Sequence, residues 1–154
     1  MKILMVCLGN ICRSPIAEGI LRKKISENLL GWTVDSCGTA NYHVGMPPDD
    51  RMIKEGKENN IDISNLRARQ FIKKDLDNFD VIYVMDESNY IHLQKLYGEE
   101  TNFNKIQILL KEDPSSKLIN VPDPYYGDSQ DFREVFNLLN KHLDLVISKL
   151  NEKR

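Results

Sequence analysis

The sequence predicts one α/β domain over residues 1–154, a three-layer sandwich in which a short parallel sheet is flanked by helices. Short apolar runs alternate with longer segments of helical periodicity, which is the pattern of a parallel sheet covered by helices. A chain of 154 residues has the length of one domain, and such a domain buries roughly 70% of its unfolded surface. No repeat, linker or low-complexity segment divides the chain.

The first half of the chain predicts two strands and two helices. Residues 3–6 are a continuous β-favouring run, typical of a buried parallel strand, and lead into a turn. Pro15 is expected at the first position of a helix, where its missing amide costs nothing. A second strand is expected over 32–37 and, after a loop over 38–48, a helix over 49–59 that begins with two acidic residues. The apolar positions of the first helix are Ile16, Ile20, Leu21, Ile25 and Leu29.

The second half predicts two further strands and ends in a long helix. Residues 81–85 and 105–110 are expected as strands, with a helix over 88–96 between them. The segment 113–127 contains three prolines and is expected as a loop. The C-terminal helix has one broad apolar face that must pack on the sheet. That face consists of Phe132, Val135, Phe136, Leu139, Leu143, Val146, Ile147 and Leu150.

Charge and composition exclude several classes of function. A net charge of -2 shows no basic excess for binding nucleic acid or a membrane surface. The apolar run after Lys2 is too short for a signal peptide, and no stretch approaches the ~20 apolar residues of a membrane span, so we expect a cytoplasmic protein. Cys7, Cys12 and Cys37 form no zinc-type spacing with histidine, which predicts free thiols and no metal site.

The segment between the first strand and the first helix carries the chemistry. A loop this short can curl so that its N–H groups point inward, next to the positive end of the helix, and so form an oxyanion receptor. Gly9 and Asn10 tolerate the positive φ that such a loop needs. Arg13 supplies a planar fork for two phosphate oxygens. The loop reads Cys7-Leu8-Gly9-Asn10-Ile11-Cys12-Arg13-Ser14.

Within this loop Cys7 is the candidate nucleophile. Inward N–H groups, the helix terminus and Arg13 all favour its thiolate, so no adjacent histidine base is required. Ser14 can donate its hydroxyl to the sulfur and ease departure of the thiolate when a phosphoenzyme breaks down. A cysteine after a strand is by itself more often a buried structural residue. The combination of Gly9, Asn10, Arg13 and Ser14 around Cys7 favours catalysis, because each residue has a separate task.

Residues 6–18, Val-Cys-Leu-Gly-Asn-Ile-Cys-Arg-Ser-Pro-Ile-Ala-Glu, resemble the signature of the low-molecular-weight protein tyrosine phosphatases. The resemblance recurs in order at 35–39, 47–49, 68–70, 85–89 and 123–127, and thus covers essentially the whole chain. It implies a four-stranded parallel sheet of the phosphotyrosine phosphatase I-like, flavodoxin-like type, no metal or other cofactor, and hydrolysis of aryl phosphates in phosphotyrosine proteins.

The resemblance also identifies Asp123 as the general acid. A tyrosine leaving group has a pKa of ~10, so a positioned acid speeds its departure, and the same carboxylate then activates water. From the residues alone, Asp123-Pro124 would be a turn starter. The resemblance places Tyr42, His43, Tyr125 and Tyr126 around the substrate cleft, although each tyrosine could also be a packing or surface residue.

The loop is expected to rest on a hydrogen-bond network of Asn10, Ser14 and Ser36, although Ser36 could equally be a strand-end serine. Several family members have a histidine shortly before Ala-Arg-Gln that supports the loop asparagine, whereas residues 65–67 here are Asn-Leu-Arg. His92 and His142 lie in expected helices and are interpreted as surface or packing residues. Cys12 suggests a redox role, because mild oxidation could form a reversible disulfide with Cys7; the other interpretation is a small packing residue.

Three other functions share this type of loop. Arsenate reductases need further cysteines downstream, and this chain has none after Cys37. Protein-arginine phosphatases tend to have threonine before the second cysteine, whereas Ile11 here suits an aryl group better. A non-catalytic phosphoanion-binding module would need neither Cys7 nor Asp123. We therefore expect a protein-tyrosine phosphatase that is a monomer, with exposed tyrosines that could support weak self-association.

Overall fold

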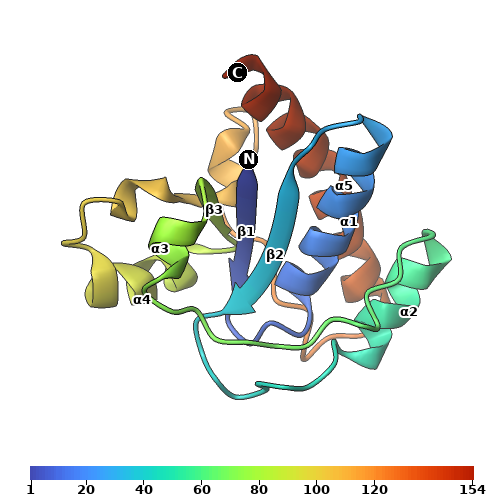
Figure 1. Cartoon of the computed structure of the whole chain (residues 1–154). Helices are drawn as coiled ribbons and strands as arrows, with labels where there is room; N and C mark the ends of the chain where they lie inside the picture. The colour runs from blue at the N-terminus through green and yellow to red at the C-terminus, as the bar shows by residue number, and fades with distance from the viewer.

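The computed structural model describes residues 1–154 and forms a four-stranded, fully parallel sheet in the order β2-β1-β3-β4. The central strand β1 pairs Val6 with Cys37 on one side and with Val84 on the other. The predicted fold class is confirmed, since helices cover both faces of this sheet (Figure 1). The strands are β1 (Lys2–Cys7), β2 (Thr33–Gly38), β3 (Val81–Val84) and β4 (Ile106–Ile108).

The helices form two layers around the sheet (Figure 1). The long helices α1 (Arg13–Glu27) and α5 (Ser129–Glu152) pack against each other on one face, with α2 (Asp50–Glu58) beside them. The other face carries α3 (Asp75–Asn78) and α4 (Glu87–Tyr97). None of these helices has the combined length and apolar character needed to cross a membrane.

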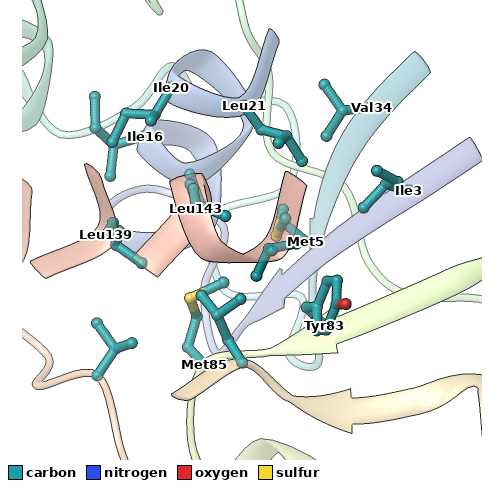
Figure 2. Close-up of a cluster of buried hydrophobic side chains, with 14 of the residues drawn as sticks. Ile3, Met5, Ile16, Ile20, Leu21, Val34, Tyr83, Met85, Leu139 and Leu143 are labelled. Carbon is teal, nitrogen blue, oxygen red and sulfur yellow. The ribbon is translucent and has the colours of Figure 1, made fainter. Parts of the chain in front are cut away.

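Alternation along β1 explains why the core has two halves. Ile3 and Met5 point toward α1 and α5, whereas Leu4 and Val6 point toward the α4 side. Figure 2 shows the first half, in which Ile16, Ile20 and Leu21 of α1 and Leu139 and Leu143 of α5 face side chains of the strands. All four β1 side chains are fully buried, and each such aliphatic side chain contributes roughly 1.5–3 kcal/mol. This packing fixes the strand whose carboxyl end carries Cys7.

Two sequence expectations at α1 were wrong. The helix begins at Arg13, so Pro15 is at its third position and not its first. The third amide of a helix also lacks an intrahelical acceptor, which is why proline is tolerated there. Leu29 lies beyond the helix, is 92% exposed and has a φ of 53°. The chain turns back toward β2 at this point, and helical periodicity alone does not register such a turn.

Two further differences concern the second half of the chain. The expected strand over 105–110 ends at Ile108, and residues Leu109–Glu112 form a 3-10 turn that buries Leu109 and Leu110. The short helix α3 was not predicted, because four residues are too few for a periodic pattern. The remaining helices and strands begin and end within a few residues of their predicted bounds.

Candidate active site

The loop over residues 8–12 lies at the carboxyl end of β1 and leads directly into α1. The backbone N–H groups of residues 8, 9, 11, 12 and 13 donate no hydrogen bond to another group of the protein. Their neighbour Asn10 donates its N–H to the Cys7 Sγ at 3.3 Å. A row of unpaired amides at a helix N-terminus is the arrangement that binds oxyanions.

Asn10 and two glycines allow the tight shape of the loop. Asn10 has a φ of 57°, the left-handed conformation expected for it, whereas Gly9 does not adopt positive φ. Gly9 instead leaves room for the His43 ring, because a Cβ there would lie 3.0 Å from that ring. Gly38 on β2 is more restrictive, because a Cβ would lie 2.6 Å from the carbonyl oxygen of Leu8. Gly38 belongs to the 35–39 segment of the family resemblance, but its close approach to the loop could not be predicted from the sequence.

Cys7 is buried at the base of the loop, and two hydrogen bonds reach its sulfur. The Ser14 Oγ lies 3.0 Å from Sγ, and the Asn10 amide approaches the same atom. A hydroxyl and a backbone N–H can each donate a hydrogen bond to a sulfur at this position. The expected contact between Ser14 and Cys7 is thus present in the structure.

The Asn10 side chain holds the loop together from below. Its Nδ2 donates to Ser14 Oγ at 2.8 Å and to Ser36 Oγ at 3.0 Å, so the predicted support network is assembled. Its Oδ1 accepts a 3.1 Å hydrogen bond from the backbone N–H of Arg69. The missing family histidine therefore does not leave Asn10 unsupported, because a main-chain donor holds its oxygen. Leu66, at that part of the chain, packs against the core instead.

Arg13 is 3% exposed and is held by a residue that sequence reasoning missed. Its Nη1 donates to Asp86 Oδ2 at 2.6 Å and to the carbonyl oxygen of Val121 at 3.0 Å. Burial opposes its charge, but the neighbouring Cys7 and the Asp86 carboxylate raise the pKa of Arg13 overall. The other oxygen of Asp86 accepts from the Asn89 N–H at 2.7 Å and caps α4. The Asp86 carboxylate thus connects the Arg13 guanidinium to the start of α4.

Asp123 lies across the cleft from the loop, and its two carboxylate oxygens make different contacts. Its Oδ1 accepts from the Tyr125 N–H at 3.1 Å, which is the turn contact expected of Asp before Pro. Its Oδ2 lies 3.6 Å from Arg13 Nη2, and the side chain is 41% exposed. The carboxyl group therefore faces both the Arg13 guanidinium and solvent.

The predicted cleft residues converge on a cavity of about 140 Å³ above Cys7. The Tyr42 and His43 rings are in a T-shaped arrangement with their centroids 6.5 Å apart, and the His43 and Tyr125 ring centroids are 6.3 Å apart. Tyr126, at the rim, is 95% exposed. Aromatic side chains on two sides of a cavity above an anion-binding loop suit the planar ring of a phenyl phosphate. The cavity is lined by Cys7, Leu8, Gly9, Ile11, Cys12, Arg13, Tyr42, His43, Asp123, Tyr125 and Tyr126.

A second arginine, which the sequence did not identify, holds the segment that follows Asp123. Arg51 donates to the carbonyl oxygens of Tyr125 at 2.9 Å and Gly127 at 3.2 Å. It also forms two side-chain hydrogen bonds with Asp49, which lower the pKa of that carboxyl. The Asp49 N–H in turn donates to the carbonyl oxygen of Ile11 at 2.8 Å. Arg51 and Asp49 therefore connect the two sides of the cleft.

The remaining candidates are placed as follows. All three cysteines are free thiols, and burial together with Asp49 and Cys7 raises the pKa of Cys12. No group of three or more His, Cys, Asp or Glu side chains has the arrangement of a metal site. His92 is exposed, whereas His142 is buried and its Nδ1 lies 2.9 Å from the Leu138 carbonyl oxygen. Both histidines lie outside the cleft.

The fold and the loop together define a class of protein, a parallel α/β domain with cysteine and arginine in one oxyanion-binding loop. The model of the low molecular weight phosphotyrosine protein phosphatase family matches residues 2–154. The human phosphatase of that name is 44% identical over 138 residues, which cover 88% of this chain and 86% of the relative. The chain belongs to this family, and the prediction of a protein-tyrosine phosphatase is confirmed.

Solved structures show the same likeness over almost the full length. The protein tyrosine phosphatase from Entamoeba histolytica superposes with a TM-score of 0.93 at 39% identity, covering 99% of this chain and 98% of that chain. YfkJ from Bacillus subtilis superposes with a TM-score of 0.93 at 34% identity, covering 100% and 96%. The four-stranded fold and its helices are thus common to this chain and its solved relatives.

Proposed function

We propose that the protein hydrolyses phosphotyrosine in protein substrates through a phosphocysteine on Cys7. The observation that carries this proposal is the geometry around one sulfur atom. Cys7 Sγ lies within hydrogen-bond distance of Ser14 Oγ and the Asn10 N–H, in a loop whose other amides are unpaired. Arg13 joins this loop, and Asp123 lies 3.6 Å from the guanidinium. The site therefore holds an anion receptor, a nucleophile and a proton donor in contact.

In the first step the Cys7 thiolate attacks phosphorus. The S–P bond forms as the bond to the tyrosine oxygen breaks, and Asp123 transfers its proton to that oxygen. The loop amides and Arg13 bind the phosphoryl oxygens, whose negative charge they stabilise as the transition state forms. The Asp86 and Val121 contacts position the Arg13 fork before substrate arrives, which reduces the entropy lost on reaching the transition state.

In the second step water releases the phosphate. The Asp123 carboxylate now removes a proton from water, whose oxygen attacks phosphorus as the S–P bond breaks. The electron pair returns to Cys7 as a thiolate, and the Ser14 hydroxyl at 3.0 Å stabilises the leaving sulfur. Asp123 is thus protonated again and ready for the next substrate. The exposed side of Asp123 supplies the route for this water.

The cleft supports an aryl substrate. Ile11 contributes a branched apolar surface, while Tyr42 and Tyr125 bound the cavity on the loop and acid sides. A phenyl ring gains contact area with such walls. A guanidinium in the same place would lose its hydration, and the only carboxylate that lines the cavity is Asp123. We therefore propose phosphotyrosine as the substrate class, in preference to phosphoarginine.

Three further expectations are retained as proposals. We infer that the protein acts in the cytoplasm as a monomer, with weak self-association through its exposed tyrosines. We also propose that Cys12 protects Cys7 by forming a reversible disulfide on mild oxidation. If Cys12→Ser recovers from peroxide followed by thiol as fully as the parent, this protective role is wrong.

Turnover and anion binding, measured on the same variant, test the function. Wild-type protein should hydrolyse p-nitrophenyl phosphate and a phosphotyrosine peptide. Cys7→Ser should lose this turnover while calorimetry still detects inorganic phosphate in the loop, because the amides and Arg13 remain. Retained turnover in Cys7→Ser would exclude the phosphocysteine route. Equal or faster cleavage of a matched phosphoarginine peptide would overturn the tyrosine preference.

A further inference from the structure

A second groove adjoins the active-site cleft, and apart from Asp123 its lining residues have no part in the reaction described above. It encloses about 430 Å³ and shares two lining residues, Asp123 and Tyr126, with the cleft. A protein substrate whose phosphotyrosine enters the cleft therefore brings its neighbouring residues to this shared wall. The groove is continuous with the catalytic site, which makes it a candidate for reading substrate sequence.

The groove combines an apolar floor with acidic edges. Val135 and Leu138 of α5 lie at its base, and Leu118 on its edge is 49% exposed. Apart from Asp123, the charged residues that line it are Asp131 and Glu134, and neither lysine nor arginine lines it. The lining consists of Leu118, Pro122, Asp123, Pro124, Tyr126, Gly127, Asp131, Glu134, Val135 and Leu138.

The two acidic side chains have no cationic partner within the chain. Asp131 accepts the Asp128 N–H at 2.8 Å as part of the helix cap, and Glu134 accepts only from Gln130 at 3.4 Å. Neither forms an ion pair with a lysine or arginine. Two carboxylates at the edge of an apolar groove match a long aliphatic side chain that ends in a cation.

We propose that this groove binds a lysine or arginine side chain that lies close to the phosphotyrosine in the substrate protein. This inference rests on the proposed function, since it assigns a substrate subsite to the same enzyme. The aliphatic part of the side chain packs on Val135 and Leu138, and its cation lies near Glu134 and Asp131. A glutamate at that position is repelled, and an alanine leaves the floor uncovered.

A peptide series tests the subsite. Phosphotyrosine peptides carry lysine, alanine, leucine or glutamate at each of the few positions on either side of the phosphotyrosine, and kcat/KM is measured for each. At one position we expect lysine to exceed alanine by about three-fold, the strength of an exposed ion pair, with glutamate lowest. The lysine advantage should shrink at high salt. It should be lost in Glu134→Gln and inverted in Glu134→Lys, because the groove then repels a cation.

The controls separate this subsite from the chemistry. Glu152→Lys makes the same charge change at the far end of α5 and should keep the lysine-to-alanine ratio of the wild type. p-Nitrophenyl phosphate has no neighbouring residues, so failure of the wild type to hydrolyse it would count against the proposed function and not against the groove. Normal hydrolysis of p-nitrophenyl phosphate with a preference for leucine or glutamate, or with no preference at any position, overturns the subsite.

Discussion

Replacing Glu18 by glutamine measures how much a buried carboxyl group on α1 destabilises the folded protein. Glu18 lies on α1 and is 1% exposed, and its Oε2 has no hydrogen-bond partner. The cation nearest to it is Arg22 at 3.6 Å, whose side chain is 60% exposed. Burial raises the pKa of Glu18 to about 8, the charge of Asp35 adds to this rise, and Arg22 and Arg69 oppose it.

The sign and size of the effect follow from the two protonation states. Between the ordinary pKa of 4.5 and the folded value of about 8, the unfolded chain is ionised while the folded protein keeps its proton. The free energy of unfolding therefore falls as pH rises through this window, by about 1.4 kcal/mol for each pH unit. At pH 7 the accumulated loss is on the order of 3 kcal/mol.

Urea unfolding at pH 5 and pH 8 measures this difference. Glutamine does not titrate, so Glu18→Gln should gain about 4 kcal/mol relative to wild type between these two pH values. Glu27→Gln, an exposed change on the same helix, should show no comparable gain. Equal pH dependence in wild type and Glu18→Gln would show that Glu18 is not held protonated, and the reasoning from burial would be refuted.

Three other substitutions test separate parts of the site. Asp123→Ala should slow substrates with poor leaving groups by ~100- to 10,000-fold and activated ones far less; a uniform loss would mean a structural role. Arg13→Lys should lower kcat/KM by about 10- to 100-fold, since lysine lacks the planar fork, and wild-type kinetics would contradict this. Gly38→Ala places a Cβ 2.6 Å from Leu8 O, so the melting temperature should fall with a loss of about 1–3 kcal/mol; an unchanged value would show that the loop yields freely.

The sequence predicted the parts of the molecule in which local pattern and chemistry agree. The apolar run at 3–6 and the helical spacing of α5 follow from burial on one or both faces, and both were recovered. Cys7, Asn10 and Arg13 lie in one short segment, so their residue types and spacing predicted that they would meet in one loop. These features are local in the chain, and local patterns are what a sequence displays directly.

The parts of the site that escaped prediction depend on contacts between distant segments. Asp86 reaches Arg13 across 73 residues, and the Arg69 amide reaches Asn10 across 59. Arg51 connects to Tyr125 over 74 residues. An aspartate at a helix cap or an arginine on a surface helix has many ordinary roles, so the residue type alone did not indicate these contacts with the site. Only the packing of the sheet and helices brings these groups together.

The direct test of the account is to trap the covalent phosphoenzyme. Asp123→Ala mixed with p-nitrophenyl phosphate should form the S–P bond readily, because this leaving group needs no acid, and then break it slowly without a base. Rapid quenching followed by intact mass and peptide mapping should find one phosphoryl group on Cys7, and Cys12→Ser in the same background should keep that location. A phosphoryl group on any other residue, or sustained turnover by Cys7→Ala, would contradict the assignment of Cys7 as the nucleophile.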